Sequence, residues 1–188
     1  KQGRAIYGVE MKIVGGDGRD QPWDGKTYGD LLVRGPWILQ QYYKGESPLV
    51  FDEAGLGWLP TGDVATIDPD GFMQITDRSK DVIKSGGEWI SSIDIENIAM
   101  GHPAVAMAAC VGMPHPKWDE RPIVVVATKP GASVTREELL AFYEGKLAKW
   151  QIPDDVVFVD AIPLGATGKM LKTKLREVLV GYQLPDLR

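Results

Sequence analysis

Three short segments of the chain combine glycine with charged side chains, a composition suited to binding ribose, phosphate or carboxylate groups. They cover residues 61–63, 77–90 and 163–172. In the first, Asp63 follows Gly62 at the entrance of a predicted strand. A carboxylate on a rigid strand end can accept two hydrogen bonds from ribose hydroxyls. Gly-Asp is also common turn chemistry, so this segment alone leaves both interpretations open.

The second segment places three cations close together, just before a glycine pair. Arg78, Lys80 and Lys84 fall within seven residues, and Gly86-Gly87 follow. Arginine and lysine can hold a phosphate or a ribose, and paired glycines permit positive φ or a close backbone approach. The alternative is a solvated hairpin with a Gly-Gly turn.

The third segment contains a lysine beside a glycine. Lys169 follows Gly168 in a stretch that holds a second glycine, Gly165. A lysine on a flexible loop can move into a site as a point charge. An ordinary loop lysine before the last helix is the alternative for this segment.

Several other segments resemble functional motifs but lack residues that those motifs require. Gly25-Lys26-Thr27 resembles the end of a P-loop, but Asp20 stands where its first glycine is needed. Residues 68–71 resemble the centre of a calcium loop, yet a plain hairpin turn fits them better. His102 and His115 each precede a proline outside any Cys/His cluster, so we predict turn or surface residues and no metal ligands.

Composition narrows the class of protein. The 188 residues carry a net charge of −5, which argues against nucleic-acid binding. The longest apolar run, residues 104–113, is about half the roughly 20 residues that a membrane-spanning helix needs. The one cysteine, Cys110, lies in this run, which excludes an internal disulfide and predicts a buried side chain. We expect a cytoplasmic protein. Because the chain starts at Lys1 without an initiator methionine, we also expect a piece of a longer polypeptide.

The elements that position these segments change character near residue 80. Residues 1–78 read as β-rich, with strands at 9–14 and 31–34 and a hairpin of 64–67 and 72–76. After this point helices and strands mix, and we predict a small α+β domain over residues 79–188. Its expected strands cover residues 104–113, 122–129 and 156–159. Its expected helices cover residues 91–100, the stretch behind a capping box at Thr135, and 172–180.

Taken together, the three segments resemble the late motifs of the adenylate-forming superfamily, which includes acyl-CoA synthetases, firefly luciferase and peptide-synthetase adenylation domains. The resemblance runs from Gly8 to Leu179. Neighbouring stretches are similar to the fatty-acyl branch: residues 85–92, 101–103 and 114–118. The resemblance implies an α+β architecture in which residues 1–78 end the large adenylating domain and 79–188 form its mobile C-terminal lid.

The implied activity has two steps in one site. A fatty acid or another carboxylic acid attacks ATP, giving an acyl-adenylate and pyrophosphate, and CoA then displaces AMP. The lid rotates between the steps. Ligases for aryl or short-chain acids, carrier-protein ligases and a non-catalytic binding module remain alternatives.

The resemblance also implies roles for nucleotide-binding residues. Asp63 matches the aspartate that binds the ribose hydroxyls, and Arg78 the arginine that assists it. Lys80 stands at the hinge position, and in the fatty-acyl branch this lysine also reaches the nucleotide. Lys84 and Trp89 match positions that face AMP.

Two further roles concern the reacting groups. Gly86, Gly87 and Glu88 match the loop that swings in for thioester formation. Lys169 matches the lysine that bridges the substrate carboxylate and the α-phosphate, where a cation offsets repulsion between two anions.

The chain departs from the family pattern in two respects. Pro60 replaces a basic residue that many relatives carry before Thr61-Gly62-Asp63. The phosphate loop, the magnesium ligands and the acyl tunnel are all expected upstream of Lys1, in the rest of the large domain. We therefore expect this chain to be inactive alone and to need that domain as a partner.

Overall fold

The computed structural model describes residues 1–185 and shows an α+β protein that divides into two compact units. The first unit is Lys1–Lys80 and the second starts at Asp81. Within residues 1–185, each unit contains one five-stranded sheet, and all three α-helices belong to the second unit. The predicted α+β class is confirmed.

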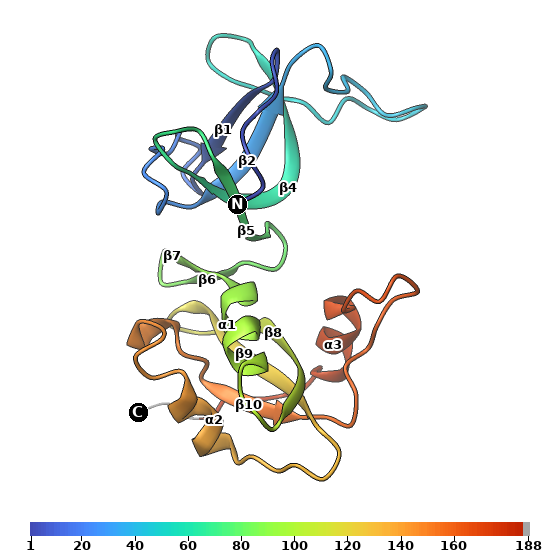
Figure 1. The fold of residues 1–188 in the computed structure, drawn as a ribbon. Coiled ribbons are helices and arrows are strands. Elements are labelled where there is room, and N and C mark those ends of the chain that lie inside the picture. The colour runs from blue at the N-terminus through green and yellow to red at the C-terminus, as the bar shows by residue number, and fades with distance from the viewer. Residues whose placement is uncertain (186–188) are drawn as a thin grey trace. The chain divides into compact units, whose positions relative to one another are not determined.

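The first unit is an antiparallel sheet built around one long strand (Figure 1). Its strands are β1 (Glu10–Val14), β2 (Gly29–Arg34), β3 (Val50–Phe51), β4 (Gly57–Ile67) and β5 (Met73–Arg78). They follow the order β1-β2-β4-β3, with β5 also paired to β4. A buried cluster of alternating strand residues fills one face: Ile13, Leu31, Ala65 and Ile67.

The predicted strands and hairpin of this unit are confirmed, but β4 begins seven residues earlier than expected. Proline and glycine weaken a strand ladder, so Pro60 and Gly62 give no local signal for a strand at this position. The sheet accommodates them with a register shift between Asp30 and Leu32. The Thr61 hydroxyl donates to the Leu31 carbonyl at 3.0 Å, which adds a side-chain bond beside this irregularity.

The second unit has helices on both faces of a mixed sheet. Its strands are β6 (Ile83–Ser85), β7 (Glu88–Ile90), β8 (Val105–His115), β9 (Asp119–Thr128) and β10 (Asp155–Phe158). The order is β10-β9-β6-β7, β8 also pairs with β9, and only β10 runs parallel to its neighbour. The helices are α1 (Ser92–Met100), α2 (Arg136–Phe142) and α3 (Lys172–Val178), with a 3-10 turn at Lys149–Gln151.

Strands β8 and β9 are buried on both faces, which explains their continuous apolar sequences. One face packs on α1 and α2, where Cys110 and Val124 meet Ile95 and Leu139. The opposite face packs on α3 and its continuation through a separate cluster of small and branched side chains. Cys110 is fully buried, as predicted.

Helix caps follow the sequence signals closely. The Thr135 capping box is present at α2, and Ser91 accepts a bond from the Asp94 amide at the start of α1. Helix α2 ends at Phe142, and α3 ends at Val178, two residues before its predicted end. The two histidines stabilise turns through Nδ1, which accepts from backbone amides two or three residues later.

Candidate functional site

The predicted ribose-binding pair forms at the end of the β4–β5 ladder. Asp63 and Arg78 lie directly opposite each other across the two strands. Arg78 Nη1 is 2.9 Å from Asp63 Oδ1, and the Asp63 side chain is 17% exposed against 55% for Arg78. The carboxylate is therefore held on a rigid strand while part of it stays accessible to a ligand hydroxyl.

The backbone around this pair is fixed by local bonds. Gly62 adopts a φ of 77°, a value that favours glycine. Its carbonyl accepts from the Ser79 amide at 3.0 Å, and the Ser79 hydroxyl donates to Asp30 at 2.6 Å. These bonds tie the chain to the first sheet up to Ser79.

The predicted hinge residue lies between two anchored neighbours. Lys80 is exposed, whereas Ser79 is bonded to the first unit and Asp81 is buried in the second. The Asp81 carboxylate is 2.9 Å from the guanidinium of Arg176 on α3. The boundary between the two compact units falls between Lys80 and Asp81.

The second predicted segment folds as the β6–β7 hairpin, with the glycine pair at its turn. Gly86 and Gly87 have φ values of 62° and 87°, the combination that a two-residue type I′ hairpin requires. Lys84 and Trp89 face each other across the hairpin, with Lys84 Nζ 5.9 Å from the indole ring centroid. Glu88 follows the turn and is exposed. The hairpin thus gathers five of the predicted site residues.

The glycine turn packs closely on a tryptophan from β9's entrance. The Gly86 amide donates to the Trp118 carbonyl at 2.9 Å. A Cβ atom added at Gly86 would lie 2.9 Å from the Trp118 ring, so any side chain here would force a neighbour to shift. Gly86 is therefore required both by its backbone angle and by this contact.

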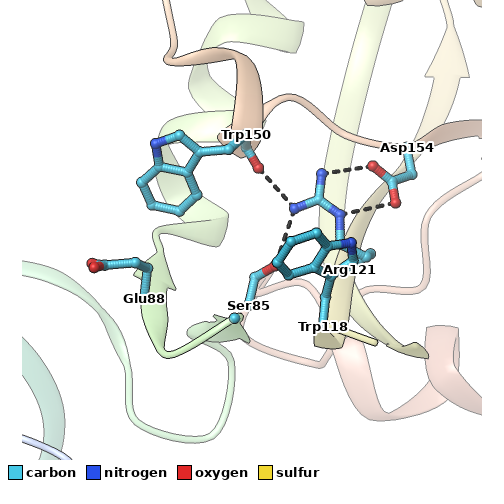
Figure 2. Close-up of a pocket in the computed structure, with 7 residues that line it drawn as sticks. Ser85, Glu88, Trp118, Arg121, Trp150 and Asp154 are labelled. Carbon is cyan, nitrogen blue, oxygen red and sulfur yellow. Dashed lines mark hydrogen bonds and ion pairs between the residues drawn. The ribbon is translucent and has the colours of Figure 1, made fainter. Parts of the chain in front are cut away.

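A pocket of about 360 Å³ opens beside this hairpin (Figure 2). Two indole side chains take part in its lining, which is made up of Ser85, Gly86, Glu88, Trp118, Arg121, Trp150 and Asp154. Such a mainly apolar space beside a few polar groups suits a flat organic group.

The polar wall of the pocket is formed by Arg121, whose N–H groups are all used in hydrogen bonds. Figure 2 shows the Arg121 guanidinium between the Asp154 carboxylate and the Ser85 hydroxyl. It donates to both Asp154 oxygens, at 2.9 and 2.6 Å, and to Ser85 at 3.0 Å. Two carbonyls, those of Trp150 and Ile152, accept the remaining bonds. With its donors already used, Arg121 shapes the pocket and does not supply a free charge for a phosphate.

The predicted lysine lies on a separate loop of the second unit. Residues 164–170 form a small closed loop in which Leu164 pairs with Met170. The Gly165 amide donates to the Lys169 carbonyl at 2.8 Å, so the backbone of Lys169 is fixed. Its side chain is exposed and makes no hydrogen bond or ion pair within residues 1–185. A backbone held by this bond and an exposed cationic side chain suit contact with an incoming anion.

Sequence reasoning missed the pocket residues Arg121, Trp150 and Asp154. One usable signal existed, because the charged Arg121 directly precedes the apolar run of residues 122–127. The partners of this arginine lie far along the chain, and no local pattern identifies them. Within the described 185 residues, no three His, Cys, Asp or Glu side chains are arranged to hold a metal ion.

Comparison with known proteins places this geometry in a family. Residues 94–169 match the AMP-binding enzyme C-terminal domain. The chain is 59% identical over 176 residues to the 3-methylmercaptopropionyl-CoA ligase of Ruegeria lacuscaerulensis, covering 94% of this chain and 32% of that protein. It is 47% identical to the medium-chain-fatty-acid–CoA ligase of Ectopseudomonas oleovorans, with the same coverage of 94% and 32%.

A solved structure gives the same result. ATP-bound MatB from Rhodopseudomonas palustris aligns with a TM-score of 0.78 and 30% identity, over 94% of this chain and 35% of MatB. The chain belongs to the adenylate-forming superfamily and contains its C-terminal domain. Its curated relatives named above are acyl-CoA ligases, and it spans about a third of their length. No helix within residues 1–185 is long and apolar enough to cross a membrane.

Proposed function

We propose that this chain is part of an AMP-forming acyl-CoA ligase that activates a carboxylic acid with ATP and transfers it to CoA. The observation that carries the proposal is the Asp63–Arg78 pair, 2.9 Å apart on neighbouring strands. A carboxylate held in this way can accept hydrogen bonds from both ribose hydroxyls, and hydrogen bonds to a charged acceptor are strong. Arg78 keeps the carboxylate oriented and stays exposed enough to approach the nucleotide.

Lys169 is the proposed catalytic residue of the first step. That step brings a carboxylate against the α-phosphate of ATP, and a cation between them offsets the repulsion. The support is an exposed ammonium on a fixed backbone, with no partner to displace within the described residues. Because the second step joins CoA thiol to an acyl-adenylate, it has less need of this charge.

The β6–β7 hairpin and the pocket beside it are proposed to act in the second step. The Gly86-Gly87 turn presents bare backbone, past which a narrow pantetheine arm can run. The pocket beside it, between Trp118 and Trp150, would take a flat group such as the adenine of CoA. Arg121 is fully paired, so the phosphates of CoA would need cations from elsewhere.

The two units are proposed to alternate between these steps. In this proposal residues 1–78 end the large domain, residues 79–188 are the mobile lid, and Lys80 is the hinge. The anchored neighbours Ser79 and Asp81 support it, since they leave Lys80 as the residue that absorbs a change in φ and ψ. Lys84 and Trp89 would then face AMP in one orientation only.

For the acid, we propose an aliphatic carboxylate. Relatives that are 47% and 46% identical are ligases for medium-chain and long-chain fatty acids, respectively. The fatty-acyl interpretation of residues 85–92 agrees with them. The complete enzyme would also bind Mg²⁺ with ATP, through groups outside this chain.

A second candidate acid is 3-methylmercaptopropionate. It is favoured by the 59% identity to two 3-methylmercaptopropionyl-CoA ligases, which exceeds the identity to the fatty-acid enzymes. This acid is short and unbranched, so it belongs to the same aliphatic class. A pocket for it would differ from a fatty-acid tunnel in depth.

The test uses the full-length protein that contains this chain. It is incubated with ATP, Mg²⁺, CoA and a pooled panel of acids that includes octanoate, palmitate, benzoate and 3-methylmercaptopropionate. Mass spectrometry then identifies the thioesters, beside a Lys169→Ala control. We expect an aliphatic acyl-CoA that is absent from the control.

The other outcomes have distinct meanings. If benzoyl-CoA were the only thioester formed, the aliphatic assignment would be contradicted, and the acyl-CoA ligase function would still be supported. Acyl-adenylate without any thioester would contradict the CoA step and favour a carrier-protein ligase. No activity at all would favour a binding module.

A further inference from the structure

A buried ion pair lies three residues beyond Lys169. The side chains of Lys172 and Glu96 are 11% and 5% exposed, and Lys172 Nζ is 2.7 Å from Glu96 Oε1. The same ammonium donates to the Ser92 hydroxyl at 2.5 Å. Burying an ion pair costs several kcal/mol of solvation per ion, so it forms only where geometry is well satisfied.

The pair connects three elements of the second unit. Ser92 and Glu96 belong to α1, and Lys172 is the first residue of α3. Glu96 Oε1 also accepts from the Cys110 amide of β8 at 2.8 Å. The start of α3 is therefore fastened to the helix and the strand that form the centre of the unit.

Helix stability does not account for a lysine at this position. A cation at a helix N-terminus is opposed by the helix dipole. The N-cap residue Leu171 supplies no side-chain hydrogen bond, and the first turn of α3 holds no acid. The favourable partner of Lys172 is Glu96, so the ion pair offsets this unfavourable position and fastens the first residue of α3 to α1.

The loop that carries Lys169 ends at this fastening point. The Leu171 amide donates to the Pro163 carbonyl at 2.9 Å, which closes the loop immediately before Lys172. Met170 packs into the cluster under α3. Two residues therefore separate the exposed ammonium of Lys169 from the buried ammonium of Lys172.

We propose that Lys172 is a positioning residue for adenylation, holding the Lys169 loop in place through its buried pair with Glu96. This role rests on the proposed ligase function. Lys172 touches neither substrate nor nucleotide in this proposal. Removing Lys172 lets the loop that carries Lys169 shift. A displacement of about 1 Å in a catalytic group can cost roughly 100-fold in rate.

The experiment separates the two half-reactions in the full-length enzyme. Acid-dependent exchange of pyrophosphate into ATP measures adenylation, and CoA added to supplied acyl-adenylate measures thioester formation. We expect Lys172→Met to reduce the adenylation rate by roughly 10- to 100-fold and to leave thioester formation within about two-fold. Lys174→Met on the same helix is exposed and serves as the matched control, with both rates unchanged.

A second variant guards against simple unfolding. Lys172→Met leaves Glu96 buried without its cation, whereas the double variant Lys172→Met/Glu96→Gln removes both charges and keeps an acceptor for the Cys110 amide. The double variant is expected to recover thermal stability but not the adenylation rate. This separation is what a positioning role predicts and a purely structural role does not.

Three results would overturn the inference. One is a folded single or double variant with wild-type adenylation, and another is an equal loss in both half-reactions. The third is an inactive wild-type enzyme, which would overturn the proposed function and this role together. The first two results, obtained with an active wild-type enzyme, would overturn this role alone.

Discussion

Lys169 and Lys172 are chemically identical side chains in two regions of opposite character. Lys169 belongs to a loop at the surface and is exposed, while Lys172 starts a helix and is paired in the interior. The same contrast separates Arg78, which is 55% exposed, from Arg121, which is 11% exposed by side chain. An exposed cation can meet an incoming anion, whereas a buried one is committed to its partners. The buried cations of this protein should therefore affect stability, and catalysis only through the groups that they position, whereas the exposed cations should affect catalysis or binding directly.

The largest expected effect is on stability, at Arg121. Arg121→Leu removes five hydrogen bonds and leaves Asp154 charged and buried. Breaking one side of a buried pair typically costs about 3–5 kcal/mol. Chemical denaturation followed by tryptophan fluorescence measures the loss. Arg19→Leu is the matched control, because Arg19 is 85% exposed and its pair with Asp17 should contribute at most about 1 kcal/mol. Equal losses in both variants would contradict the contrast.

The next effect is on catalysis, at Lys169. Lys169→Ala should reduce adenylation by roughly 10²- to 10³-fold, the usual cost of removing one preorganised charge partner. Stability should change by less than about 0.5 kcal/mol, as for other exposed positions. Pyrophosphate exchange and thermal unfolding measure the two quantities, with exposed Lys174→Ala as control. A large loss of stability would place Lys169 with the buried cations.

A smaller effect is expected on nucleotide binding, at Asp63. Asp63→Asn removes a charged acceptor, and hydrogen bonds to charged groups contribute about 1.5–3 kcal/mol. The Kd for AMP should rise by roughly 10- to 100-fold in calorimetric titration of the full-length protein. Asp70→Asn, at the turn of the same hairpin, controls for loss of one negative charge. An unchanged Kd would remove Asp63 from the site.

The smallest expected effect is on stability, at Tyr143, whose hydroxyl is buried and uncharged. The Tyr143 hydroxyl donates to the Ile95 carbonyl at 3.1 Å, and burial raises the pKa of Tyr143 well above its usual value of 10. The protonated form is thus favoured in the folded state. Its contribution is complete below about pH 10, where the unfolded tyrosine titrates, and is lost as pH rises further.

Tyr143→Phe tests this titration. At neutral pH the variant should lose about 0.5–1.5 kcal/mol, the usual net contribution of one hydrogen bond. Above pH 10 the gap between variant and wild type should narrow, because only the wild type has this buried group to deprotonate. Denaturation at several pH values checks this, with Tyr43→Phe as the 91% exposed control. A gap independent of pH would contradict the stated direction of the pKa.

Much of the fold could be read from local patterns. Ser91 and Thr135 predict helix starts, because the side-chain oxygen of an N-cap residue accepts a hydrogen bond from an amide that the helix leaves unpaired. Continuous apolar runs predicted β8 and β9, since strands covered on both faces need no polar alternation. The start of β4 could not be predicted, because Thr61 offsets the disturbance from Pro60 through a bond to Leu31 on another strand.

The candidate site likewise has residues that local sequence patterns predicted and residues that they did not. Asp63, Arg78, the Gly86-Gly87 turn and Lys169 were found because each combines glycine or charge within a few neighbouring residues. The structure shows that Asp63 meets Arg78 and that the glycines form a type I′ turn. The pocket beside that turn was not found, because its walls come from separate segments of the chain.

The sequence by itself determined the α+β class, the helix caps and the segments rich in glycine and charge, because each depends on side chains a few residues apart. Tertiary structure decided which charges are buried and paired. Arg121 meets Asp154 across 33 residues of sequence, and Lys172 meets Ser92 across 80. No local pattern specifies such partners. Burial makes them necessary, since a charge removed from water requires a partner wherever the fold can bring one.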